Sequence, residues 1–383
     1  MYPLLALRGN PFTLSLKYLC LLIALLPLND VYLQTVMKLS KKHAAPEPEL
    51  GSVLLLQVPR TNEKKELAAE QMLASLHGLL LSSQATFMGS KSSRERVSFE
   101  IAVKAKRIGF YVWVPDYLKS FVEEQIYAQY PTVHISEVPD YTITDVHEQN
   151  IALCTELKLT ANEALPVKTF PSFEVDPLAA ITATLAQFEA NEEAWMQVVV
   201  RPASDNWYKK SESYAASIRG GKTSTKGLFK ALWAPPESDT SAPKLAEHES
   251  ARANAAEEKS HKLAYEVVVR IIYRGANLPQ AKMRMQAITA SFKQFNTTYL
   301  NGFAQKAYTS GEYDVDMYRR RAFPKRGFVL NIEEVASLYH LPHTNVETPN
   351  ILWANAKTAE PPATLPLATQ ANQHEVSPVA VTN

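Results

Sequence analysis

The feature that most constrains the fold of this chain is one order of predicted elements that occurs twice. In each copy a strand precedes an amphipathic helix, two alternating strands follow, and a second helix leads to a closing strand. The copies define predicted domains at 50–145 and 150–345. This βαββαβ order is typical of the split βαβ arrangement. The predicted fold class is therefore α+β, with two ferredoxin-like modules.

The first copy has the clearest strand period. Apolar residues occupy every second position at 97–103 and again at 108–114, which predicts a hairpin of two adjacent strands. Ser98, Glu100 and Ala102 fall between the apolar residues of the first strand. A strand at 53–58, a helix at 62–81, a second helix capped by Asp116 and a closing strand at 132–138 complete the copy. The apolar face of the helix at 62–81 consists of Ala69, Met72, Leu73, Leu76, Leu79 and Leu80.

The second copy repeats this order around a long insertion. Asp176-Pro177 predicts a helix start, with aspartate as the cap and proline in the first turn. The expected strands are 151–159, 195–200, 265–273 and 313–318. The polar insertion at 204–262 is predicted to contain helical and disordered parts. The second helix shows a period of 3.6 through Ala281, Met285, Ile288, Phe292 and Phe295.

The segment after the second copy contains a capping signal and then a change in composition. Asn331 followed by Glu334 is typical of a capping box at the start of a short helix over 333–339. After Trp353 the chain becomes rich in alanine, proline, threonine and glutamine. Residues 354–383 are therefore predicted to be a disordered tail.

The first 45 residues are predicted to form a membrane-anchor helix and a linker. The apolar run at 14–28 is shorter than the roughly 20 residues that span a bilayer, but 11–37 is long enough. A cleaved signal peptide and a buried helix of a soluble domain remain alternatives. The lysines that follow the run favour a cytoplasmic location for the bulk of the chain; they are Lys38, Lys41 and Lys42.

One short segment concentrates positive charge between aromatic rings. Its candidate contact residues are Arg319, Arg320, Arg321, Lys325 and Arg326. Cations neutralise phosphates and rings stack on bases, so nucleic-acid binding here, together with the basic stretch at 201–230, is one hypothesis. Docking of an acidic protein surface is the favoured one, because a net charge of +1 gives the whole chain no broad attraction for nucleic acid.

Two further motifs lack residues that a phosphate-binding loop or a metal site requires. Gly220-Gly221-Lys222-Thr223 has Ala216 where a phosphate-binding loop requires its first glycine. His340 and His343 lie three residues apart, but Pro342 interrupts a helix between them and no third ligand follows in sequence. The sequence thus predicts turn and packing roles for both histidines. It predicts no catalytic residues, no metal and no cofactor, and hence no enzyme; an unrecognised active site remains a minor alternative.

Several longer stretches together resemble a known family. They are AAEQMLASLHGLL (68–80), FYVWVPDYLKSFVEEQIYAQYP (110–131), LKLTANEALPVKTFPSFEVDPLAAITATLAQFE (157–189), EAWMQVVVRPASDNW (193–207) and GFVLNIEEVASLYHLPHTNVETPNILWANAKTAEPPATLP (327–366). They are similar to the N-terminal, non-ATPase region of membrane-anchored type IV secretion or conjugative DNA-transfer ATPases. The most similar version is found in candidate-phyla bacteria as a domain of unknown function. The resemblance covers about 50–366 in collinear order.

The resemblance implies an assembly or positioning domain for such a motor, without catalysis of its own. In that family a proline-rich linker leads to a RecA-like motor, whereas this sequence ends at Asn383. The expected partner is therefore a motor ATPase domain that is encoded separately or was lost by truncation, unless the chain is a stand-alone paralogue. A homo-oligomer is compatible with this reading.

Overall fold

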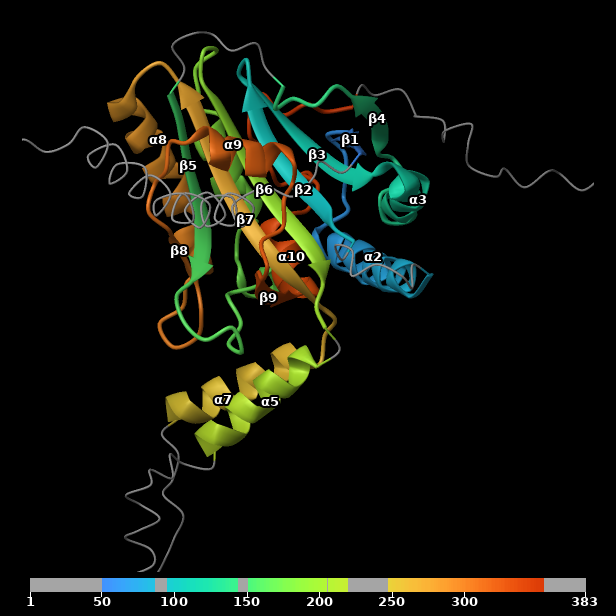
Figure 1. Cartoon of the computed structure of the whole chain (residues 1–383), viewed down its shortest axis with the longest axis vertical. Helices are drawn as coiled ribbons and strands as arrows, with labels where there is room; N and C mark the ends of the chain where they lie inside the picture. Colours follow the sequence, from blue (N-terminus) through green and yellow to red (C-terminus); the bar gives the residue numbers. More distant parts are fainter. Residues whose placement is uncertain (1–49, 87–94, 144–150, 205, 220–246, 355–383) are drawn as a thin grey trace, which may run out of the picture. The chain divides into compact units, whose positions relative to one another are not determined.

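The computed structural model describes residues 50–86, 95–143, 151–204, 206–219 and 247–354. They form a mixed α+β structure around one nine-stranded antiparallel sheet (Figure 1). The predicted α+β class is thus confirmed. The strands are β1 (Gly51–Gln57), β2 (Val97–Lys104), β3 (Arg107–Pro115), β4 (His134–Val138), β5 (Ile151–Leu159), β6 (Glu193–Pro202), β7 (Ala264–Gly275), β8 (Phe303–Gln305) and β9 (Phe328–Asn331).

The order of strands in the sheet is β4-β1-β3-β2-β6-β7-β5-β8, and β9 pairs with β7. The second half repeats the first in reverse, with β5, β6, β7 and β8 in the places of β1, β2, β3 and β4. The halves meet where β2 pairs with β6 over seven residue pairs, from Val97↔Val200 to Val103↔Ala194. Two antiparallel four-stranded units are therefore continuous through this seam.

Helices cover one face of the sheet and bury most of the core. They are α2 (Glu66–Thr86), α3 (Lys119–Gln129), α4 (Pro177–Leu185), α8 (Leu278–Ser291) and α10 (Ile332–Leu338). Three 3-10 turns accompany them at 116–118, 170–172 and 292–295. In β2 the alternation predicted from sequence directs Phe99 and Ile101 into this core. The cap of α4 at Asp176 and the capping box of α10 are both confirmed.

The opposite face of the sheet is covered by α9 (Glu312–Arg319) and the segment that follows it. A strand was predicted at 313–318, and that prediction is wrong. Val315 and Tyr318, three residues apart, are both buried against the sheet, which is the spacing of a helix. Acidic residues in the first turn also favour a helix start. The edge position belongs instead to the short strand β8.

The insertion between β6 and β7 contains two helices that lie side by side, α5 (Trp207–Arg219) and α7 (Glu247–Ser260) (Figure 1). Small residues let them approach closely: Ala215, Ala253 and Ala256 are buried between them. Residues 205 and 220–246 lie outside the described part. The predicted anchor at 11–37 and the tail at 355–383 also lie outside it. Among the described residues, no helix is both long and apolar enough to cross a membrane.

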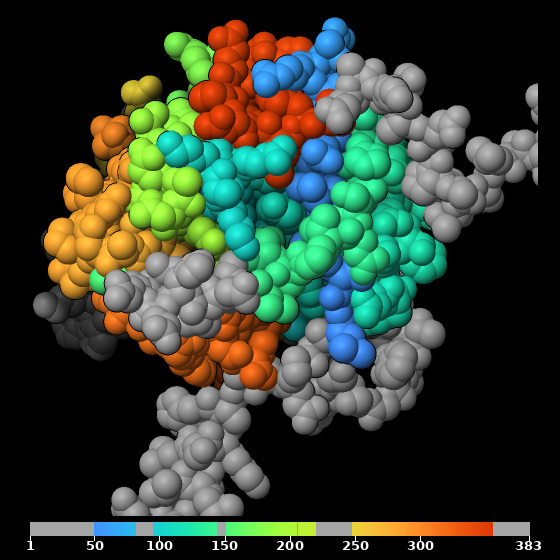
Figure 2. Space-filling view, turned by 90° about the horizontal axis from the view of Figure 1, so that it is seen from above, coloured from blue at the N-terminus to red at the C-terminus, as the bar shows by residue number. Residues whose placement is uncertain are grey.

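The two ends of the described chain lie side by side (Figure 2). The backbone N–H of Thr344 donates to the carbonyl of Asn62, and that of Ala354 donates to the carbonyl of Val58. The Asn62 amide donates to the carbonyl of Pro342 at 2.9 Å. The start of α2 is therefore fixed against the segment that follows α10.

Candidate functional site

A row of polar side chains crosses the centre of the sheet on the face covered by α9. Glu100 lies opposite Tyr111 on one side and Gln197 on the other. Gln197 in turn lies opposite Arg270, and Arg270 lies opposite Glu156. Because side chains alternate along each strand, these five share one face. The row runs from β3 to β5 and passes through the seam between the halves.

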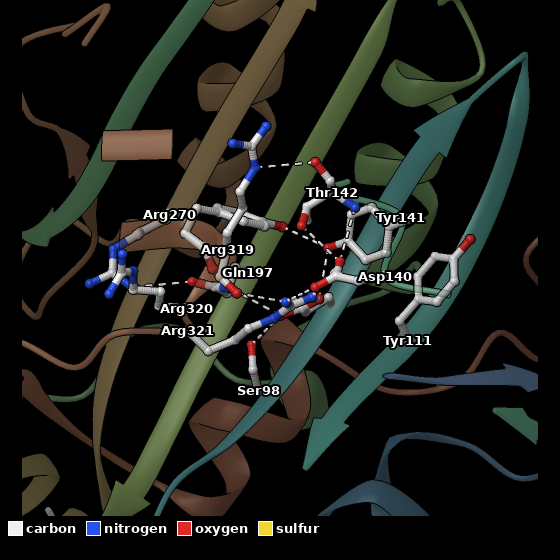
Figure 3. A network of polar contacts seen from close by, with 12 residues as sticks. Ser98, Tyr111, Asp140, Tyr141, Thr142, Gln197, Arg270, Arg319, Arg320 and Arg321 are labelled. Atoms are coloured by element: carbon white, nitrogen blue, oxygen red, sulfur yellow. Dashed lines mark hydrogen bonds and ion pairs between the residues drawn. The ribbon is translucent and has the colours of Figure 1, made fainter. Parts of the chain in front are cut away.

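Glu100 lies in this row on the β2 side of the seam and is fully buried. Arg321 binds it in a bidentate manner, with Nε and Nη2 each 3.0 Å from a carboxylate oxygen (Figure 3). Ser98 and Tyr141 each donate a hydroxyl hydrogen bond of 2.7 Å to it, and the Gln197 amide donates at 2.9 Å. A buried carboxylate is tolerated only when its oxygens are satisfied in this way.

Arg321 reaches the sheet because of how α9 ends. The N–H of Ala322 bonds the carbonyl of Met317 and the N–H of Arg321 bonds the carbonyl of Tyr318, which is the Schellman pattern. Arg321 has a φ of 47°, in the left-handed region where glycine is usual. This turn directs the guanidinium down to Glu100 and also to Asp140, whose carboxylate it pairs with.

Opposite charges in this network each stabilise the ionised form of the other. Burial alone would lower the pKa of Arg321, but Glu100 and Asp140 raise it well above its ordinary value. Burial alone would raise the pKa of Asp140, but Arg321 holds it below the usual range. Arg321 and Asp140 therefore remain ionised at neutral pH, and Arg321 joins Asp140 and Glu100 in a buried ion-pair network.

The five residues predicted to contact a partner do not form one basic surface. Arg321 is buried, with 1% of its side chain exposed. Arg319 donates to the carbonyl of Thr142 at 3.2 Å, and Arg320 pairs with Asp316 at 2.8 Å.

The remaining two cations of that segment lie at the surface. Arg326 is 57% exposed and pairs with Glu163. Lys325 is exposed, and its carbonyl accepts a hydrogen bond of 3.0 Å from Arg201. The acidic groups that this basic segment binds in the structure therefore belong to the chain itself.

The basic stretch at 201–230 is divided in the same way. Lys210 lies 3.6 Å from Glu163, and Arg219 pairs with Glu257. Three further lysines of the stretch lie outside the described residues: Lys222, Lys226 and Lys230. Arg326 pairs with the same Glu163, so the two basic stretches meet at this carboxylate, which offsets part of their positive charge.

A cavity of about 310 Å³ opens at the Arg270 end of the polar row. Arg270 binds Glu156 through Nε and Gln197 through Nη1, and Lys306 also binds Glu156. Cys154 lines the cavity, but burial raises the pKa of its thiol to about 12, so it carries no reactive thiolate at neutral pH. The cavity has room for a small polar molecule; Glu156 and the two cations are paired with one another, and Asp314 also lines the cavity.

Sequence reasoning missed Glu100, Gln197 and Arg270. The alternation in 97–103 places Glu100 on the face of its strand opposite the core, and that face is usually exposed to solvent. Arg270 lies inside the apolar run of 265–273. A charged residue in such a buried strand needs a buried partner, so its position could have predicted one. The partner itself lies in another strand, far away in sequence.

The fold defines the class of this protein as an α+β domain built on one antiparallel sheet with a buried ionic network. Comparison with protein families is more specific. The chain belongs to the family described as Domain of unknown function (DUF8128), which matches residues 31–354. The expected domain of unknown function is thereby confirmed, while the family description makes no link to type IV secretion ATPases.

Comparison with curated proteins gives no match. Among solved structures, xylooligosaccharide oxidase from Myceliophthora thermophila C1, in complex with xylobiose, is similar with a TM-score of 0.29 and 9% identity. The match covers 68% of this chain and 46% of that chain, which is less than half of the oxidase.

This structural neighbour is an enzyme, so the prediction that the chain is not an enzyme is contradicted and is not retained. A likeness at a TM-score of 0.29 carries no argument for oxidase activity in this chain.

Proposed function

We propose that this chain is an assembly and positioning domain that works beside a type IV secretion-like or conjugative DNA-transfer motor. The observation that carries the proposal is the internal use of the basic segment. Arg321 binds Glu100 and Asp140 inside the molecule rather than an outside phosphate. These ion pairs join the second half of the sheet to the first, and a rigid structure of this kind suits a platform for other proteins.

The sequence resemblance supplies the identity of the partner in this proposal. The resemblance covers both halves of the sheet, and we interpret each half as a ferredoxin-like module. The partner is a motor ATPase domain on a separate chain or in a longer form of this one. Residues 11–37 would hold the platform at the membrane, with the bulk of the chain on the cytoplasmic side.

The α5–α7 hairpin is the docking element that we propose for the motor. It is an insertion between two central strands, and its outer surface carries exposed charges of both signs, including Lys209, Glu212 and Glu249. Mixed charges give specificity and orientation to a protein–protein contact. The nucleic-acid alternative has less support, because Arg321 is buried and the other three arginines of the segment each have a partner within the chain.

The test is co-purification of the full chain with a RecA-like motor encoded beside it, with mass measured by light scattering after size-exclusion chromatography. A stable complex is expected. Glu212→Lys on the hairpin should weaken it, whereas the control Glu124→Lys, on exposed α3 surface, should leave it unchanged. Absence of a complex would contradict the proposed motor partner. Equal binding by the two variants would contradict the hairpin as the docking element.

The membrane part has its own test. Cells that express the full chain and a version starting at Ala45 are fractionated without detergent. The full chain should sediment with membranes and the shorter chain should not. A full chain that remains in the soluble fraction refutes the anchor.

A further inference from the structure

Four side chains with metal-binding groups converge beneath the C-terminal segment. Asp176 caps α4, Glu66 opens α2, and His340 and His343 follow α10. Ligand atoms of Glu66, Asp176 and His340 all lie within 4.8 Å of one another. The His343 Nε2 lies 3.0 Å from Asp176 Oδ2 and 4.0 Å from Glu66 Oε1. Sequence reasoning singled out only the two histidines of this cluster, because the carboxylates come from helices that are distant in sequence.

The hydrogen bonding of His340 suits a metal ligand. Its Nδ1 lies 2.9 Å from the carbonyl oxygen of Ala336, which can only accept, so Nδ1 carries a hydrogen. Its Nε2 faces Asp176 Oδ1 at 3.0 Å. In metal sites a histidine donates one ring N–H to a carbonyl in this way, which leaves its other nitrogen to bind the ion.

Two buried polar atoms at this place have no hydrogen-bond partner among the described residues. They are Asp176 Oδ2 and His343 Nε2, and both side chains are only 2% exposed. The 3.0 Å between them is within hydrogen-bonding distance, but the contact is not aligned as a hydrogen bond. Since the N–H of Asn345 donates to His343 Nδ1 at 3.3 Å, the ring hydrogen of neutral His343 lies on Nε2, toward Asp176.

We propose that this cluster is a binding site for a divalent transition-metal ion of the Zn²⁺ type. His340 Nε2 and the carboxylates of Asp176 and Glu66 are the protein ligands. His343 is a positioning residue, because its Nε2 faces Asp176 Oδ2 at 3.0 Å and attracts that carboxylate.

The geometry and the charges agree with this assignment. Two atoms bound to one tetrahedral zinc at 2.0–2.1 Å are roughly 3.3 Å apart, close to the separation of His340 Nε2 and Asp176 Oδ1. Two carboxylates neutralise a divalent cation without a further counter-ion. The imidazole ligand favours zinc over magnesium or calcium, which prefer oxygen ligands. Such an ion would join α2, α4 and the segment after α10.

The test measures zinc binding by the full chain. The protein is treated with a chelator, dialysed and titrated with ZnCl₂ by calorimetry, and its metal content is measured by mass spectrometry. One equivalent per chain is expected, with an increase in melting temperature. Co²⁺ in place of Zn²⁺ should give the visible absorption of a low-coordinate nitrogen–oxygen site.

Two ligand variants and one control locate the ion. Glu66→Gln and His340→Gln should each weaken zinc binding by more than about tenfold, as loss of metal-site groups does. Glu63→Gln, an exposed carboxylate just before α2, should bind as the wild type does. Glu66 is only partly buried, so its variant decides the question if His340→Gln does not fold. A folded wild type without saturable binding, or binding that Glu66→Gln leaves unchanged, overturns the proposal.

Discussion

At the scale of single residues, Arg321 joins parts of the chain that are distant in sequence. Its guanidinium follows α9, whereas Glu100 lies in β2 and Asp140 follows β4. A run of three arginines is visible in the sequence. Which of them is buried depends on the end of α9 and on the register between β2 and β6. The register joins strands that are distant in sequence, so the sequence suggested a surface for all three.

Arg321→Ala should destabilise the fold by about 3–5 kcal/mol, because it leaves the carboxylate of Glu100 buried without its cation. The free energy of unfolding is measured in a denaturant titration followed by circular dichroism. The matched control is Arg326→Ala, which removes a surface ion pair worth at most about 1 kcal/mol. Equal effects of the two substitutions would show that the buried network does not form.

Replacing both partners tests the same network from the other side. Arg321→Met combined with Glu100→Gln removes both charges, and the new amide retains hydrogen-bonding capacity toward Ser98 and Tyr141. The double variant should be more stable than Arg321→Met alone, since no unpaired carboxylate remains buried. A double variant that is less stable than the single one argues against Glu100 as the main partner.

At the scale of secondary-structure elements, helix-capping residues predicted helix starts correctly, whereas the spacing of apolar residues in 313–318 did not identify the element. Asp176 caps α4 and Asn331 caps α10 as predicted, because a cap needs only residues within one turn. In contrast, 313–318 has apolar residues at spacings of both two and three. Only packing against the sheet selects the helix, and packing is a property of the whole fold.

The helix α8 and the 3-10 turn after it carry the apolar face that the sequence predicted. Phe292 is 1% exposed and packs against Phe295 and Phe303. Phe292→Ala should cost about 3–5 kcal/mol in free energy of unfolding, as truncation of a buried ring does. The neighbouring exposed residue supplies the control: Lys293→Ala should leave the denaturation midpoint nearly unchanged. If both variants behave alike, the register of this segment is incorrect.

At the scale of the whole described structure, the two halves form one sheet. The sequence revealed two copies of the same order, but not how they join. Each copy by itself would leave β2 or β6 as an edge with unpaired backbone groups, and edges of this kind are prone to aggregation. Pairing β2 with β6 removes both edges, and the row from Glu100 to Arg270 crosses that seam.

Acid should destabilise the protein through its paired carboxylates. Burial alone would raise the pKa of Asp140 and Glu156, but Arg321 and Arg270 respectively help to lower them below their ordinary values. Groups of this kind stabilise the fold above their unfolded pKa of about 4, and the stabilisation is lost as the pH falls through the lower folded values. Glu334 acts in the opposite direction, because burial raises its pKa.

The free energy of unfolding should therefore decline as the pH is lowered from about 5 toward 2. Denaturant titrations at a series of pH values measure it, with Asp140→Asn as the comparison. That variant should show a shallower decline. A wild-type stability that is constant or increases over this range would contradict the ion-pair assignment.

The most direct test of the continuous sheet is hydrogen–deuterium exchange of the full chain in increasing denaturant. Peptides from Arg107–Pro115 in the first half and Ala264–Gly275 in the second report on central strands on either side of the seam. One cooperative structure predicts that both become exchangeable at the same denaturant concentration, and that Arg321→Ala shifts both together. Exchange of one half at clearly lower denaturant, with the other still protected, would contradict the account.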